Sequence, residues 1–402
     1  MGMVEGYEQI VQPPSAADAA LDQPRASIAA SMMFGTLVFL AMATAPIMLG
    51  GLVQAGRLSN NTLGLVATLE TLGIALGSSI GPTLLRAGHF RTKVLVCCLA
   101  LAALNWACMD ALDARPIAIL RGACGLAEGV VLAAANLILT YTRNPEGMSG
   151  YFLGITTLPQ VAATYGLSSY AIPRWGPNVG FELMAVTALL AGAAALAASG
   201  DTIPAAQRSD RGRSRWSSFA LAALATIILQ NAAIGAGYSY MVQIAEQQAI
   251  PDSVVGLSMA ALQATAMVGS LAVGVIGWRA SQALMLTAGC LVQVAVTLTI
   301  VHGGGSAAYA IGAGLFGLCW NGLLPFSLKL LIELDPSRRL ALLNSPASLA
   351  GFGLGPFLVA GLVSERDVAP AFVAAAAMFA AASGLYGAIN LFSRDARRRA
   401  TR

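Results

Sequence analysis

Charged side chains are scarce in this sequence. Only 10% of the residues are charged and 57% are hydrophobic, whereas about a quarter of the residues in a soluble globular domain are charged. The chain therefore lacks the polar side chains that would cover a water-exposed surface, and we expect a lipid bilayer to cover much of it. The net charge of +4 comes without a basic patch interleaved with aromatic residues, so nothing indicates a nucleic-acid partner.

Several residue types needed for common chemistry are nearly missing. The lysines are Lys93 and Lys329, and neither follows a glycine, so the Gly-Lys pair of a phosphate-binding loop is absent and ATP-driven pumping within the chain is excluded. The histidines are His89 and His302, both expected in loops, so membrane haem ligation and zinc-protease chemistry lack their ligands. We expect no enzyme activity, no metal site and no cofactor.

Long apolar segments fill most of the chain. A hydrocarbon core of about 30 Å needs roughly 20 helical residues for each crossing. No segment has the ten-residue alternation of a membrane barrel, so helices are expected. We predict an all-α membrane protein with twelve transmembrane helices, at residues 27–53, 62–85, 94–112, 116–141, 148–172, 179–200, 217–245, 254–277, 281–301, 306–332, 340–363 and 369–392.

The helices divide into two halves, residues 27–200 and 217–393, joined by the polar linker 201–216. Short patterns recur between the halves at a spacing of nearly 200 residues, which indicates an internal duplication. We therefore predict two pseudo-symmetric six-helix bundles. Residues 1–26, which lack the basic start of a signal peptide, are expected to form a flexible cytoplasmic tail, and 394–402 a basic cytoplasmic tail.

The basic residues predict the orientation, because positively charged loops stay on the cytoplasmic side. With both termini in the cytoplasm, most arginines fall in cytoplasmic loops or tails. The opposite face keeps only Arg57, Arg115, Arg174 and Arg366. The localisation that we expect is a bacterial inner (plasma) membrane.

A motif follows the second predicted helix: Gly81-Pro-Thr-Leu-Leu-Arg86-Ala-Gly88-His89-Phe-Arg91. The fourth helix contains Arg121-Gly-Ala-Cys-Gly125 followed by Gly129, and the eleventh contains Gly351-Phe-Gly-Leu-Gly355-Pro356.

On these motifs the sequence, from about residue 27 to 393, resembles the major facilitator superfamily of secondary transporters. The first motif resembles the family's cytoplasmic gating motif, although Leu85 stands where the family has an aspartate. The glycines of the other two resemble helix-packing motifs; Leu158 interrupts the corresponding motif of the fifth helix, which gives only weak support for antiport.

The resemblance implies alternating access by a monomer that carries a small molecule through a central cavity lined mainly by helices 1, 4, 7 and 10. Buried amides in lipid-embedded helices face the bundle interior, where they bind either substrate or a neighbouring helix. The candidates for the substrate cavity are Asn136, Gln230, Asn231, Trp320 and Asn321, and helices 5, 8 and 11 add Gln160, Gln263 and Asn344.

Three charged residues are predicted inside the membrane, where a charge costs about 2.5 to 3.5 kcal/mol on insertion scales. They are Glu70, Arg121 and Glu128. Arg121 and Glu128 share a helix face but are separated by about 10 Å along the axis, so we do not expect a tight pair between them. Our hypothesis is that Glu128 takes and releases a coupling proton while Glu70 and Arg121 tune it. The alternative is a Glu70–Arg121 ion pair that only neutralises two buried charges.

The function predicted from these observations is secondary transport of a small organic solute, neutral or weakly charged, with protons as the coupling ion. An uncoupled facilitator remains open as an alternative. A transporter-like sensor or scaffold would need a large cytoplasmic domain, for which the linker and tails leave no room.

Overall fold

The computed structural model describes residues 23–86, 88–140, 142, 145–199, 217–276, 281–335, 340 and 343–400, and all regular elements within these ranges are helices. Residues 1–22 of the predicted tail, the predicted linker 201–216 and the side chain of Arg86 lie outside the described part of the chain.

The helices of the first half correspond to the predicted segments. They are α2 (Arg25–Gln54), α3 (Asn60–Arg86), α4 (Phe90–Asp110), α5 (Ala114–Thr140), α6 (Pro145–Gly166), η1 (Leu167–Ala171), α7 (Ile172–Trp175) and α8 (Asn178–Ala195). The predicted helix 148–172 is not a single α-helix, because the π-helical turn η1 interrupts it.

The described part of the second half is also helical. Its helices are α9 (Ser218–Ser239), α10 (Met241–Gln247), α11 (Asp252–Ile276), α12 (Gln282–His302), α13 (Ser306–Leu334), α14 (Asn344–Ala360) and α15 (Ala369–Ala400). The predicted helix 217–245 breaks at Tyr240, between α9 and α10, and α15 extends through residues 394–400 of the predicted tail.

Ten of the described helices are long and apolar enough to cross a membrane. The helices α6 and α14, which overlap the predicted crossings 148–172 and 340–363, are not among the ten. The chain is therefore an all-helical, multi-pass membrane protein, and the number of twelve crossings stays a prediction.

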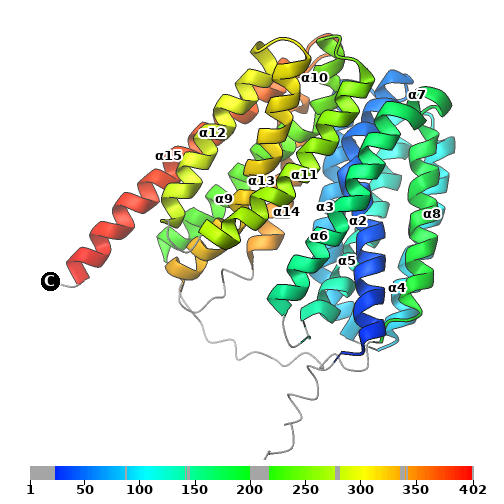
Figure 1. The fold of residues 1–402 in the computed structure, drawn as a ribbon, viewed down its shortest axis with the longest axis horizontal. Helices are drawn as coiled ribbons and strands as arrows, with labels where there is room; N and C mark the ends of the chain where they lie inside the picture. The colour runs from blue at the N-terminus through cyan, green and yellow to red at the C-terminus, as the bar shows by residue number, and fades with distance from the viewer. Residues whose placement is uncertain are drawn as a thin grey trace, which may run out of the picture.

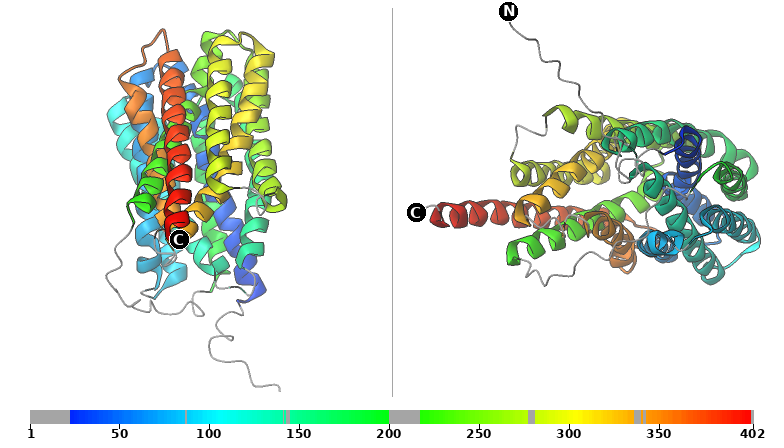
Figure 2. Two further views of the ribbon diagram at one scale, coloured as in Figure 1. Left: turned by 90° about the vertical axis from the view of Figure 1, so that its left-hand side faces the viewer. Right: turned by 90° about the horizontal axis from the view of Figure 1, so that it is seen from below.

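The helices form two groups that meet along one end of the molecule. Figure 1 shows α2 to α8 on the right and α9 to α15 on the left, close together at the top and diverging toward the bottom. Figure 2 shows that helices of both groups extend over the same height. We call the end at which α2 begins and α15 ends the terminal side, and the opposite end, where α2 connects to α3, the far side.

Close helix packing inside the first group depends on glycines of α3 and α5. A Cβ atom on Gly125 would overlap the carbonyl oxygen of Glu70, and one on Gly129 would overlap the carbonyl oxygen of Ile74. The Cβ of Ala133 leaves only 2.6 Å for a Cβ on Gly81. Small residues let two helix backbones approach within the bilayer, so this contact fixes the height of Glu70 relative to α5.

The second group repeats this device. Gly269 of α11 lies against a carbonyl oxygen of α13, and Gly351 and Gly355 of α14 lie against carbonyl oxygens of α9. α14 also crosses to the first group, where the carbonyl oxygen of Pro356 is 2.7 Å from the position of a Cβ on Gly64. Packing of α14 on α3 and of α11 on α6 joins the two groups.

Candidate functional site

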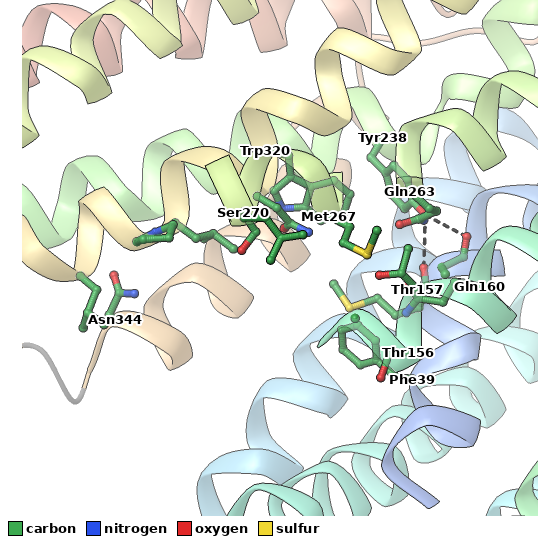
Figure 3. A pocket seen from close by; sticks show the side chains of 18 residues that line it. Phe39, Thr156, Thr157, Gln160, Tyr238, Gln263, Met267, Ser270, Trp320 and Asn344 are labelled. Atoms are coloured by element: carbon green, nitrogen blue, oxygen red, sulfur yellow. Dashed lines mark hydrogen bonds between the residues drawn. The ribbon is translucent and has the colours of Figure 1, made fainter. Parts of the chain in front are cut away.

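A cavity of about 570 Å³ lies between the two groups of helices (Figure 3). Its walls come from α2 and α6 of the first group and from α9, α11, α13 and α14 of the second. Tyr238, Gln263 and Gln160 lie at one end and Asn344, the first residue of α14, at the other, so the cavity extends from the middle of the molecule toward the terminal side.

Both polar and apolar side chains line this cavity. The polar lining residues include Thr156, Thr157, Gln160, Gln263, Ser270, Asn321 and Asn344. The apolar lining residues include Phe39, Met42, Met267, Leu271, Trp320, Leu324 and Leu328. Among the described residues that line the cavity none is charged, so its walls offer hydrogen bonds and apolar contact without an ionic partner.

Trp320 and Tyr238 of the cavity wall pack together with Phe352. The Trp320 ring stacks on Phe352 at 5.2 Å between centroids with an interplanar angle of 16°, and Tyr238 meets Trp320 edge-on at 5.0 Å. Such contacts hold ring orientations beyond what burial alone provides. The exposed part of Trp320 therefore offers a fixed aromatic surface to the cavity.

The predicted cavity residues divide between this cavity and other places. Trp320 and Asn321 line it. Gln230 is buried and accepts a hydrogen bond at 2.8 Å from the hydroxyl of Tyr386 on α15. Asn231 is also buried, and its side-chain amide donates to the carbonyl oxygen of Ile227 at 2.8 Å. Both amides thus have helix partners, and neither residue belongs to the cavity lining.

Asn136 lies in a second cavity of about 320 Å³ between α3, α5 and α14, together with Ser78, Ser79, Thr140 and Ser345. By contrast, Gln160, Gln263 and Asn344, the predicted contributions of helices 5, 8 and 11, line the larger cavity. Helical periodicity alone did not distinguish the amides that line the large cavity from those that contact another helix, because an amide in a bundle interior can face either one.

The three predicted intramembrane charges form one buried cluster. The Nε of Arg121 donates to Oε2 of Glu70 at 3.0 Å, and its Nη2 donates to Oε1 of the same carboxylate. Its Nη1 donates to Oδ1 of Asn105 on α4 at 2.8 Å. This bidentate geometry is the strong form of an arginine–carboxylate contact.

Glu128 lies at the edge of the cluster. Its Oε1 is 4.0 Å from Nη2 of Arg121, has no hydrogen-bond partner, and is buried with the rest of the residue. The 4.0 Å separation is smaller than the expected axial separation of about 10 Å, because the long arginine side chain reaches along the helix. The expectation of no tight pair agrees with the missing hydrogen bond.

The predicted gating motif, residues 81–91, lies on the terminal side. Gly88 has φ of +88°, in the left-handed region that favours glycine, and turns the chain between α3 and α4. Arg91 donates from Nε to the carbonyl oxygen of Ala198, just after α8. The part of the motif that the structure describes therefore connects elements within the first group.

The known proteins to which this chain is similar are found among solved structures. No known protein family matches by sequence profile, and no curated protein matches by sequence. A mutant of the nucleoside transporter NupG matches with a TM-score of 0.73 at 11% identity, over 90% of this chain and 99% of that one. Another NupG structure, over 90% and 98%, has a TM-score of 0.64 at 11% identity.

A bacterial homologue of the human lysosomal transporter Spinster, in an inward-facing and unoccupied conformation, matches with a TM-score of 0.62 at 14% identity, over 94% of this chain and 98% of that one. The chain has the fold of the major facilitator superfamily.

Within this major facilitator fold, the charge cluster and the large cavity are neighbours but not the same site. A small void of about 20 Å³ is lined by Glu70 together with Met42 and Tyr238. Met42 and Tyr238 also line the large cavity. These two side chains therefore separate the carboxylate of Glu70 from the space that a solute could occupy.

Proposed function

We propose that this protein is a secondary transporter that moves a small neutral organic solute by alternating access and couples the movement to protons. In this proposal the chain crosses the membrane twelve times as two pseudo-symmetric six-helix bundles and works as a monomer in the inner membrane of a bacterium. Both termini lie in the cytoplasm, so the terminal side is the cytoplasmic side.

The observation that carries the coupling is the charge of the buried cluster. It holds one guanidinium and two carboxylates, and Glu70 takes the bidentate hydrogen bonds of Arg121. One guanidinium and two ionised carboxylates leave one negative charge, so the cluster is neutral only when it also holds one proton. An uncompensated buried charge is costly, which favours binding of that proton. Glu128, whose Oε1 has no hydrogen-bond partner, is the carboxylate on which that proton resides with the least loss of contacts.

The cavity supports a neutral and amphipathic substrate. Its lining combines amides and hydroxyls with an aromatic wall and holds no charge among the described residues. A planar ring that carries a polar, uncharged group fits this mixed lining. Nucleosides have this chemistry, and NupG is a nucleoside transporter, so uridine and adenosine are the first solutes to test.

The conformation is consistent with a carrier open to the cytoplasm. The cavity extends to Asn344 on the terminal side, while hydrogen bonds close the far side. Nε2 of Gln54 donates to Oε1 of Glu246 at 2.5 Å, and Nδ2 of Asn60 donates to the carbonyl oxygen of Ser364 at 3.0 Å. Each of these bonds links the two groups of helices.

The test uses proteoliposomes that enclose a pH-sensitive dye. A thermal-shift screen of neutral solutes, beginning with uridine and adenosine, selects the solute, and its addition should then move protons in the wild-type protein. Glu128→Gln should abolish the proton movement and gradient-driven accumulation but keep exchange of labelled solute. Glu182→Gln, at an exposed position of α8, is the control and should behave as wild type. Unchanged proton movement in Glu128→Gln would refute the coupling.

A second candidate is an uncoupled facilitator. The bidentate Glu70–Arg121 contact favours it, because joining α3 to α5 explains this neutral ion pair without any part in proton coupling. In that case solute flux occurs without proton movement in the wild-type protein, and Glu128→Gln transports at the wild-type rate.

A further inference from the structure

Pro46 creates an unusual acceptor in the middle of α2. Proline has no N–H group, so the carbonyl oxygen of Met42, four residues earlier, lacks the amide donor of a regular helix. A carbonyl buried in a membrane protein without its helix donor needs another partner. The chain supplies one from the other group of helices.

That partner is Tyr238, near the end of α9. Its hydroxyl lies 2.9 Å from the carbonyl oxygen of Ala43 and 3.4 Å from that of Met42, so its proton is shared between adjacent carbonyls of α2. Tyr238 is only 2% exposed. The contact joins the two groups of helices above the large cavity, on the side where they are closed.

Gln263 extends this contact to the cavity wall. Its Nε2 donates to the hydroxyl oxygen of Tyr238 at 3.1 Å, so one chain of hydrogen bonds runs from α11 through α9 to α2 (Figure 3). Both Gln263 and Tyr238 line the cavity. The Gln263 amide carries two N–H donors and one acceptor oxygen, so a solute that turns this amide toward the cavity removes the hydrogen bond to Tyr238.

Tyr238 contacts residues of the cavity wall and also lies near the charge cluster. Its ring meets Trp320 edge-on, and the Tyr238 and Phe352 ring centroids are 5.8 Å apart, so a solute that moves the Trp320 ring alters the packing of the tyrosine. Tyr238 also lines the small void that Glu70 lines. A displacement of Tyr238 changes the environment of both the solute and the charge cluster.

We propose that Gln263 and Tyr238 form a latch that holds the far side closed at the Pro46 position of α2, and that the cavity controls the latch through Gln263. Tyr238 is a positioning residue in this proposal, because it acts on the conformation of the helices. The proposal rests on the alternating access of the proposed function. Opening of the far side requires the Tyr238 hydroxyl to leave the carbonyls of α2.

The experiment measures the far-side opening directly, by electron–electron double resonance between spin labels in lipid nanodiscs. The six native cysteines are replaced, and the labels are attached after Leu112→Cys and Arg366→Cys. Leu112, in the α4–α5 connection, is 72% exposed, and Arg366, in the α14–α15 connection, is also exposed. The two positions belong to different groups of helices, so opening lengthens the distance between the labels.

Tyr238→Phe keeps the ring and removes the hydroxyl. Loss of one such hydrogen bond should raise the ratio of open to closed far-side populations roughly threefold to fivefold. Tyr309→Phe is the matched control. Tyr309 is equally buried and its hydroxyl donates at 3.0 Å to the carbonyl oxygen of Met241, but both residues belong to the second group. This variant should leave the populations unchanged.

Gln263→Leu tests the connection to the cavity. It should shift the populations in the same direction as Tyr238→Phe, and the double variant should shift them no further than Tyr238→Phe alone, because both changes break one chain of hydrogen bonds. Unchanged populations in Tyr238→Phe, an equal shift in Tyr309→Phe, or fully additive shifts in the double variant would each overturn the latch. The measurement needs neither a proton gradient nor a transported solute, so its failure is distinguishable from a failure of proton coupling.

Discussion

Replacing Glu70 by glutamine should destabilise the protein far more than the same replacement of Glu128. The two carboxylates share one arginine, but their contacts differ. Glu70 accepts two hydrogen bonds from Arg121, whereas Oε1 of Glu128 lies at 4.0 Å without a hydrogen bond. A glutamine can accept only one of the two bonds that Glu70 accepts, and it removes the charge.

The expected magnitudes follow from these contacts. Breaking a buried ion pair costs about 3–5 kcal/mol when the remaining charge is left uncompensated. In Glu70→Gln the carboxylate of Glu128 remains within reach of Arg121, so we expect a smaller loss of about 2–3 kcal/mol. Glu128→Gln breaks no hydrogen bond and should cost less than about 1 kcal/mol. The double replacement leaves Arg121 uncompensated and should cost about 5 kcal/mol, more than the sum of the single losses.

The assay is unfolding in detergent micelles by titration with sodium dodecyl sulfate, followed by tryptophan fluorescence, on the wild type, both single variants and the double variant. Glu182→Gln, on the exposed face of α8, controls for the loss of a carboxylate and should change the free energy of unfolding by less than about 0.5 kcal/mol. Equal losses for the two single variants, or strictly additive losses in the double variant, would refute the assignment of Glu70 as the fixed partner of Arg121.

Three further predictions follow from the packing and the cavity. Gly125→Val should reduce the yield of folded protein in size-exclusion chromatography, because a side chain there overlaps the carbonyl oxygen of Glu70, whereas Gly384→Val, with no atom beyond its own helix backbone within 4 Å of its Cβ position, should not. Trp320→Ala should weaken uridine binding at least roughly tenfold in calorimetry and Trp320→Phe should weaken it less, since the aromatic wall is partly kept. Asn60→Ala should shift the Leu112–Arg366 label distances toward the open far side, because it removes the hydrogen bond to Ser364.

The helical architecture could be predicted from composition and segment length because the bilayer imposes both. Every predicted apolar segment overlaps a described helix, and the two interruptions, at η1 and at Tyr240, are the places where the chain departs from the regular period. A local π-turn depends on how the helix packs, so hydrophobic runs do not reveal it.

The candidate site was less predictable. Burial of Glu70, Arg121 and Glu128 follows from their positions in apolar segments, and the sequence left a Glu70–Arg121 ion pair open as one alternative. The bidentate geometry of that pair, with Glu128 4.0 Å away, depends on the packing of α3 against α5. Trp320 and Asn321 line the cavity, while Gln230 faces α15. A sequence gives the depth of a side chain in the membrane, and the helix rotation that selects its neighbour comes from packing.

The sequence alone determined that this protein spans a membrane many times and that a few charges are buried in it, because the absence of polar side chains and the cost of open backbone in lipid leave no other solution. Only the tertiary structure decided which partners those charges have and that Tyr238 reaches the carbonyls beside Pro46, residues nearly two hundred positions away. Contacts between distant helices depend on rotation, crossing geometry and small-residue packing, which are properties of the assembled bundle.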